Sequence, residues 1–234
     1  MNWPGEVIEA TFLRRYKRFL ADFRLDNGQE VTAHCANTGS MKTCLKEGAR
    51  AWITHHDDPK RKLAYSWQAI EMDDGWVGIH TGLANGLVKE AVVEGRIPEL
   101  TGYGGIAAER KYGQNSRIDL LLSEPGRANC YVEVKNVTLL LGPEVVGFPD
   151  AVTARGLKHL NDLMAVVSGG NRAVLFYCVQ RASAKCVRPA EAFDPDYTAA
   201  LREAMAAGVE VLAYRARLTP QAVWLDCSIP LKTD

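Results

Sequence analysis

Hydrophobic and polar residues alternate in short runs over the first part of the chain, which is the pattern of strands with one buried face. Between two of these runs, Asp26-Asn27-Gly28-Gln29 favours a hairpin turn. Several short strands with little helix predict a small β-barrel, and an OB-like barrel is the commonest solution of this kind that handles nucleic acid. The predicted strands cover residues 7–12, 19–25, 30–35, 49–54, 63–71 and 76–79.

From Gly82 onward the pattern changes to helices that alternate with strands. Gly95 is expected to end the first helix, and Asp194 and Pro195 are expected to begin the last one as N-cap and first helical residue. This part of the chain therefore predicts an α/β layer, within an α+β protein of two domains, residues 1–82 and residues 83–234. The predicted helices begin at residues 83, 151 and 195, and the predicted strands cover residues 118–122, 130–137, 172–181 and 209–217.

Composition adds few constraints to this picture. The chain has 234 residues, of which 47% are hydrophobic, and its 28 basic and 28 acidic residues leave no net field to attract a polyanion. Six cysteines lack the C-x-x-C spacing of zinc or redox sites, so free thiols in a reducing compartment are expected. No signal sequence and no apolar run of about 18 residues is found, which predicts a cytoplasmic protein without a membrane partner.

Candidate chemistry is concentrated in Asp119, Glu133 and Lys135, on two predicted strands joined by a turn. Alternate strand residues share a face, and an antiparallel neighbour can place Asp119 beside the other two side chains. Two carboxylates suit a hard cation such as Mg²⁺ (or Mn²⁺), and an adjacent ammonium can orient an attacking water. Glu109 is a candidate third carboxylate. The alternative is an ordinary charged surface, with Glu133 and Lys135 as an ion pair.

Basic and aromatic residues provide candidates for nucleic-acid contact. One segment combines four cations with two aromatics, Tyr16 and Phe19, as phosphate contacts and base stacking require, although a solvated basic face is an equal alternative. A second set lies on one face of the helix predicted from residue 151, with a solvated flank as its alternative. Gln180 ends a predicted strand near the site edge. The complete set is Arg14, Arg15, Tyr16, Lys17, Arg18, Arg117, Arg155, Lys158, His159 and Gln180.

Several ordered blocks make the chain resemble the sugar fermentation stimulation protein A family over nearly its whole length. The resemblance implies an N-terminal OB-like domain and a C-terminal domain of the PD-(D/E)xK nuclease fold. It also implies non-specific DNA binding and a regulatory link to sugar utilisation. The blocks include Arg14 to Phe19, Ala33-His34-Cys35-Ala36-Asn37-Thr38-Gly39-Ser40-Met41, Ser116-Arg117-Ile118-Asp119, Glu133-Val134-Lys135-Asn136-Val137-Thr138, Phe148-Pro149-Asp150-Ala151-Val152-Thr153 and Gly208-Val209-Glu210-Val211-Leu212-Ala213-Tyr214.

By this resemblance, Asp119 and Glu133 become metal ligands, Lys135 the motif lysine and Glu109 the upstream acid. Pro149-Asp150 follows Glu133 in the chain, so it is not the first half of the motif. Three functions are consistent with these features: an Mg- or Mn-dependent nuclease, a non-catalytic DNA-binding regulator of sugar (maltose) genes, or an enzyme acting on a small sugar-linked molecule. Symmetry is common among such nucleases, so a homodimer is a further expectation.

Overall fold

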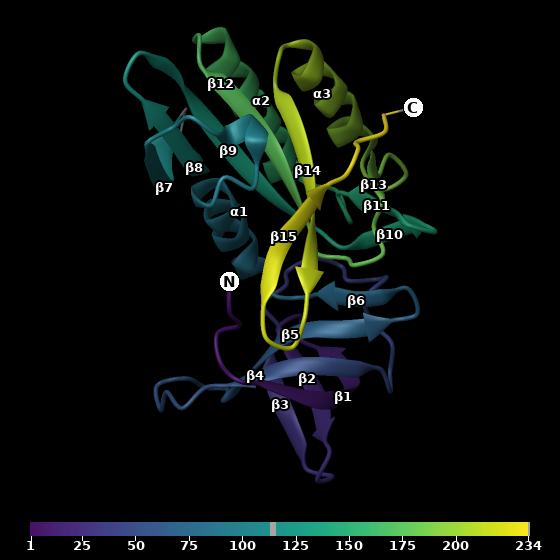
Figure 1. Ribbon diagram of the computed structural model, residues 1–234. Coiled ribbons are helices and arrows are strands. Elements are labelled where there is room, and N and C mark those ends of the chain that lie inside the picture. The colour runs from purple at the N-terminus through teal and green to yellow at the C-terminus, as the bar shows by residue number, and fades with distance from the viewer. Residues whose placement is uncertain (113–115, 234) are drawn as a thin grey trace.

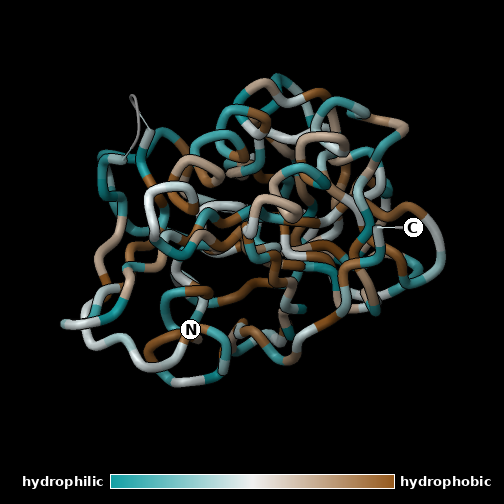
Figure 2. The backbone as a smooth tube through the Cα atoms, turned by 90° about the horizontal axis from the view of Figure 1, so that it is seen from above, coloured by the Kyte–Doolittle hydropathy of each residue, from teal (hydrophilic) through white to brown (hydrophobic). Residues whose placement is uncertain are grey.

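The computed structural model describes residues 1–112 and 116–233. A β-barrel formed by the N-terminal part of the chain lies at the bottom of Figure 1, and a larger α/β unit lies above it. Seen from above, hydrophilic residues occupy many of the outer turns (Figure 2). None of the helices in the described ranges has both the length and the apolar composition needed to span a bilayer.

The barrel has the strand connections of an OB fold. Its strands follow the order β3-β2-β1-β4-β5-β6, and a parallel pairing of β3 with β5 closes the first five into a barrel. The predicted OB-like barrel is therefore confirmed. Inside it, the Trp67 ring lies 5.0 Å from the Phe12 ring and 5.3 Å from the Phe23 ring, between centroids. The strands are β1 (Val7–Tyr16), β2 (Leu20–Leu25), β3 (Glu30–His34), β4 (Arg50–His55), β5 (Tyr65–Met72) and β6 (Gly75–Gly78).

The α/β unit is a six-stranded mixed sheet in the order β15-β14-β12-β9-β8-β7, with β9, β12 and β14 parallel. Helix α1 packs on one face, and helices α2 and α3 pack on the other. The strands are β7 (Gly105–Tyr112), β8 (Ser116–Glu124), β9 (Arg127–Val137), β12 (Arg172–Val179), β14 (Glu210–Leu218) and β15 (Val223–Ser228), and the helices are α1 (Ala84–Val93), α2 (Ala154–Ser168) and α3 (Pro195–Ala206). A small sheet contains β10 (Leu139–Gly142), β11 (Val145–Phe148) and β13 (Cys186–Pro189), and two 3-10 turns are η1 (Thr81–Leu83) and η2 (Pro98–Leu100).

Polar caps explain where two of the helices begin. The Asp194 carboxylate accepts the Tyr197 N–H at 3.0 Å, so α3 starts at Pro195 as predicted. The Thr153 hydroxyl accepts the Gly156 N–H at 2.9 Å, so α2 starts at Ala154, three residues later than the pattern suggested. Strands β7, β10, β11, β13 and β15 were not predicted, because short or edge strands carry a weak periodic signal.

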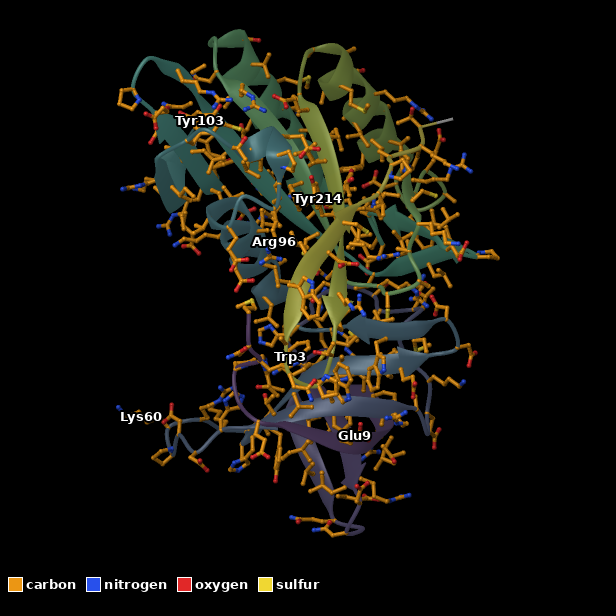
Figure 3. All side chains as sticks on the ribbon, in the orientation of Figure 1. Trp3, Glu9, Lys60, Arg96, Tyr103 and Tyr214 are labelled. Atoms are coloured by element: carbon orange, nitrogen blue, oxygen red, sulfur yellow. The ribbon has the colours of Figure 1, made fainter. Side chains whose placement is uncertain are left out.

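The two parts of the molecule share a hydrophobic core. Trp3, Trp52 and Trp76 pack in one cluster with the apolar face of α1, and the Trp3 indole donates to the Thr219 carbonyl at 2.8 Å. Figure 3 places Trp3 where the barrel meets the α/β unit. The predicted division between residues 82 and 83 falls within η1. Because Trp3 packs with α1, the first residues of the chain help to fix the barrel against the second unit.

A buried ion pair also crosses the interface. The Arg181 guanidinium, only 2% exposed, contacts the Asp74 carboxylate of the barrel at 2.5 and 2.6 Å. Arg181 also donates to the carbonyls of Thr43 and Thr138, both at 3.1 Å. A lone charge in this position would be costly, whereas here each charge is paired and hydrogen-bonded. Together with the shared core, this pair fixes the relative position of the two units.

Candidate active site

A cavity of about 350 Å³ lies between the barrel and the α/β unit; we call it the interdomain cavity. The loop after β3 forms one wall, β8 and β9 supply the acidic residues and Lys135, and residues of η1, α1, β10, β11 and the start of α2 complete the lining. The lining residues are Asn37, Thr38, Gly39, Thr81, Ala84, Asn85, Asp119, Glu133, Val134, Lys135, Asn136, Thr138, Leu139, Gly147, Phe148, Asp150, Arg155 and His159.

Asp119 reaches the cavity because β8 and β9 separate at this point. The last pair of their ladder is Leu120 with Val132. Beyond it, the Val134 N–H donates to Asp119 Oδ2 at 2.7 Å in place of a strand partner, and the Asn85 side-chain amide donates to Oδ1 at 2.8 Å. The carboxylate thus satisfies a free backbone donor while it stays fixed beside β9.

Glu133 and Lys135 lie on the same face of β9, as alternation along a strand predicts. The Lys135 ammonium donates to Glu133 Oε1 at 2.6 Å and lies 3.0 Å from His159 Nδ1. His159 Nδ1 also hydrogen-bonds Glu133 Oε1. Glu133 is only 3% exposed, and its other oxygen, Oε2, is buried with no hydrogen-bond partner among the described residues.

The two carboxyl groups respond to this environment in opposite directions. Burial, and next the negative charge of Glu133, raise the pKa of Asp119 above its ordinary value, and hydrogen bonds from Val134 and Asn85 only partly oppose this. Burial would also raise the pKa of Glu133, but the His159 hydrogen bond and the positive charge of Lys135 outweigh it, and its pKa is lowered. Glu133 is therefore ionised at neutral pH, and a cation beside it would favour the ionised form of Asp119 as well.

The structure brings Asp119, Glu133, Lys135, Arg155 and His159 to the cavity. Of these, His159 differs from the prediction in its surroundings. Its side chain is buried against Glu133 and Lys135, so the expected exposed phosphate contact is replaced by a contact that orients the acidic group.

Gln180 is wrong as a nucleic-acid contact. Its side chain is 0% exposed, and its amide donates to Asn136 Oδ1 at 2.5 Å. The physical reason is that β6 of the barrel covers the end of β12, where the Gly78 N–H donates to the Gln180 carbonyl at 2.7 Å. Contact between the two units buries this position, and the pattern of β12 in the sequence does not reveal that contact.

The structure does not bring Glu109 or Arg117 to the cavity. Both are exposed, and the nearest approach of their charged groups is 3.9 Å. The β7–β8 register would set Glu109 opposite Asp119, but Glu109 has a φ of 50° and the pair is missing. Lys158 is likewise outside the cavity, where it pairs with Asp162 at 2.8 Å.

The basic segment, residues 14–18, forms the end of β1 and the tight turn into β2; we call it the basic turn. Lys17 and Arg18 have φ values of 45° and 64° and are exposed. Arg14 pairs with Asp22 at 2.8 Å, and the Tyr16 hydroxyl donates to the same carboxylate at 3.1 Å. The Arg15 guanidinium donates to the Asn37 carbonyl at 2.9 Å, so this turn adjoins the wall of the interdomain cavity.

Sequence reasoning missed Asn85 and gave Asp150 no role. Asn85 holds Asp119, but a single asparagine near the start of a helix carries no distinctive signal. Asp150 accepts the Ser40 N–H at 2.6 Å and the Ser40 hydroxyl at 3.0 Å. It therefore joins the two walls of the cavity, and no sequence spacing links these two positions.

Comparison with known proteins gives consistent results along the chain. The family model described as the SfsA N-terminal OB domain matches residues 13–79, and the sugar fermentation stimulation protein RE domain matches residues 82–222. A sugar fermentation stimulation protein homolog of Thioalkalivibrio sulfidiphilus is 55% identical, over 97% of this chain and 95% of the relative. The homolog of Geobacter sulfurreducens is 52% identical, over 99% and 98%.

Among solved structures, Pyrococcus furiosus SfsA in complex with Ca²⁺ is similar over 99% of this chain and 98% of that one. Its TM-score is 0.88 at 25% sequence identity. The two family models divide the chain as the structure does, into an N-terminal OB domain and a second domain. The chain belongs to the sugar fermentation stimulation protein (SfsA) family.

Proposed function

We propose that this protein binds DNA and hydrolyses its phosphodiester bonds with a divalent cation, Mg²⁺ or Mn²⁺, held between Asp119 and Glu133. One observation carries the proposal: Glu133 Oε2 is buried without a partner among the described residues, in a cavity that Asp119 also lines. Buried polar atoms are nearly always satisfied, and a cation supplies what this oxygen lacks.

The donor chemistry suits a hard cation. In the described ranges, no three or more His, Cys, Asp or Glu side chains gather as a metal-binding group. The proposed ligands are thus two carboxylates, and water molecules would complete the coordination shell, as is usual for Mg²⁺ in proteins. The Pyrococcus furiosus relative was solved with Ca²⁺, another cation that prefers oxygen ligands. When bound, the cation would polarise a phosphoryl oxygen and lower the pKa of a water.

The chain's own residues have separate tasks in this proposal. Lys135 holds and orients the water that attacks, because its ammonium is fixed by Glu133 and His159 in the interdomain cavity. His159 keeps Glu133 in place, and Asn85 does the same for Asp119. Arg155, exposed at the rim, binds a phosphate of the DNA. Glu109 has no part, because it is exposed outside the cavity.

A second candidate is a non-catalytic DNA-binding regulator of sugar genes, and the names of the relatives, which refer to stimulation of sugar fermentation, fit its link to sugar use. In that case the OB barrel and its basic turn would bind DNA, and the buried carboxylates would have a structural role only. The small-molecule enzyme has no comparable support. A homodimer and a cytoplasmic location stay predictions.

Cleavage assays separate the two functions. Supercoiled plasmid and single-stranded DNA are incubated with the protein in Mg²⁺, in Mn²⁺ and in chelator. We expect cleavage that needs the metal, and its loss in Asp119→Asn and in Lys135→Ala, with DNA affinity retained. Asp196→Asn and Lys185→Ala, both on exposed positions away from the cavity, serve as matched controls. Absence of cleavage with every metal, alongside intact DNA binding, would leave the regulator.

A further inference from the structure

An exposed aromatic pair lies beside the basic turn of the barrel. Phe19 is 43% exposed, and its ring stacks on that of His34, with centroids 6.4 Å apart and planes 18° from parallel. The 43% of this side chain that faces solvent gains no stability from burial and is free to contact a ligand. Stacked aromatic rings next to cations are the arrangement on which proteins stack the bases of single-stranded nucleic acids.

The backbone that carries the aromatic pair is joined to the loop that forms one wall of the interdomain cavity. The Cys35 N–H donates to the Phe19 carbonyl at 2.8 Å, and the loop after Cys35 supplies Asn37, Thr38 and Gly39 to that wall. The Arg18 guanidinium donates to the Thr38 carbonyl at 3.2 Å. Cation, ring and cavity wall therefore form one surface held by hydrogen bonds.

A second hollow joins this surface to the cavity. It has a volume of about 470 Å³ and is lined by Arg15 and Arg18 on one side and by residues 148–153 on the other. It shares Thr38, Gly39 and two residues of the α/β unit with the interdomain cavity. A strand lying in the second hollow would thus lie next to the interdomain cavity that holds Asp119 and Glu133.

The size and closure of the interdomain cavity favour one strand over two. Its volume of about 350 Å³ falls at the lower end of the 300–1,000 Å³ typical of small-ligand pockets. The Ser40 N–H and hydroxyl bridge its walls to the Asp150 carboxylate. In a duplex the base faces are also occupied by stacking on their neighbours and the edges by pairing, so Phe19 would find no free base.

We propose that the DNA entering the site is single-stranded, and that it reaches the interdomain cavity over Phe19 and His34, with Arg15 and Arg18 beside its phosphates. Duplex ends and nicks would then be substrates only where a single strand is freed. Cleavage of a strand that follows this route rests on the proposed function. Binding of the strand along the route does not depend on cleavage.

Binding in chelator tests the route without any catalysis. The probe is a fluorescent single strand of about 16 nucleotides, the upper site size of an OB fold, against the same sequence as a blunt duplex. We expect tighter binding of the single strand. Phe19→Ala should weaken that binding by about 5- to 150-fold, the range for loss of stacking on one base, and should leave duplex binding unchanged. Because Phe19 is exposed, the variant is expected to fold, which thermal unfolding verifies.

Two matched controls accompany this test. Met205→Ala removes a similarly exposed hydrophobic side chain from α3, and it should not change the affinity. Arg18→Ala should lower the salt slope of log affinity for the single strand by about 0.7, whereas Arg202→Ala on α3 should not. Equal binding of the two probes, or wild-type affinity in Phe19→Ala, would overturn the route.

Cleavage in Mg²⁺ then separates this inference from the function it rests on. If both probes are cut equally and Phe19→Ala has no effect, the route is wrong and the nuclease stands. If neither probe is cut but Phe19→Ala weakens single-strand binding, the nuclease is wrong and the route stands. Preferential cutting of the single strand, reduced in Phe19→Ala, supports both.

Discussion

The basic turn lines the second hollow, and the carboxylate cluster, formed by Asp119, Glu133 and His159, lines the adjoining interdomain cavity. The two regions hold their charged groups in opposite ways. The turn takes its charges from neighbouring residues and leaves Arg14, Lys17 and Arg18 exposed to solvent. The cluster collects Asp119, Glu133 and His159 from β8, β9 and α2 and holds them with hydrogen bonds, with Glu133 and His159 buried and Asp119 half-buried. Several exposed cations can each contribute a part of phosphate binding, whereas in the carboxylate cluster every side chain holds its neighbours in place. The turn should therefore tolerate single changes that the cluster does not.

The largest effect is expected at Glu133. We predict that Glu133→Gln lowers the single-turnover cleavage rate by about a thousandfold or more, since it removes several kcal/mol of transition-state stabilisation. DNA affinity in chelator should stay near wild type. The exposed Glu203→Gln on α3 is the matched control. A rate within about tenfold of wild type would remove Glu133 from the mechanism.

The next effect concerns the ion pair of Arg181 with Asp74, which joins the α/β unit to the barrel and so fixes the carboxylate cluster relative to the basic turn. Asp74→Ala leaves Arg181 buried without its partner, so the free energy of unfolding should fall by about 3 kcal/mol. The neighbouring Asp73→Ala removes an exposed pair with Lys46, and it should change stability by less than about 1 kcal/mol. Urea denaturation measures both. Equal values for the two variants would mean that the buried pair does not hold the interface.

A smaller effect is expected at His159, which acts through Glu133. His159→Gln should raise the Mg²⁺ concentration needed for half-maximal cleavage by about 10- to 100-fold, because residues that orient a metal ligand have effects of this size. His55→Gln, on an exposed barrel position, is the control. An unchanged metal requirement with a lower maximal rate would instead assign His159 to the chemical step.

Asp74 also predicts a pH dependence of stability. Burial would raise its pKa, but hydrogen bonds from Arg181 and Ser183 outweigh this, and its pKa lies below the ordinary 3.8. A lowered pKa in the folded state stabilises the fold above about pH 3.8, and this contribution is lost as pH falls through the folded-state pKa. Acid titration of unfolding should therefore be flatter in Asp74→Asn than in wild type. Parallel curves would contradict this assignment.

The smallest effect separates two cations of the basic turn. Among the described residues, the exposed Lys17 ammonium has no ionic partner, whereas Arg14 is already paired with Asp22. Lys17→Ala should lower the salt slope for single-stranded DNA by about 0.7, and Arg14→Ala by less. Affinity measured from low to moderate salt gives both slopes. A larger decrease for Arg14→Ala would show that the ion pair opens on binding.

Local patterns were sufficient for much of the fold. Alternation along the chain predicted the barrel strands, and the Asp194-Pro195 cap predicted the start of α3, because these features depend on near neighbours. The pairing of Glu133 with Lys135 on one face of β9 followed from the same two-residue period. The short β10, β11 and β13 escaped prediction, since four residues carry too weak a periodic signal, and β13 also pairs with a strand distant in sequence.

What the sequence by itself determined was the set of elements and the acidic and basic residues that they carry. Only the tertiary structure decided which of these residues meet. It buried Gln180 under β6, left Glu109 exposed and recruited Asn85 from α1 to hold Asp119. The reason is physical: strand periodicity fixes the face on which a side chain lies, but contact between distant segments depends on how sheets, helices and the barrel pack together.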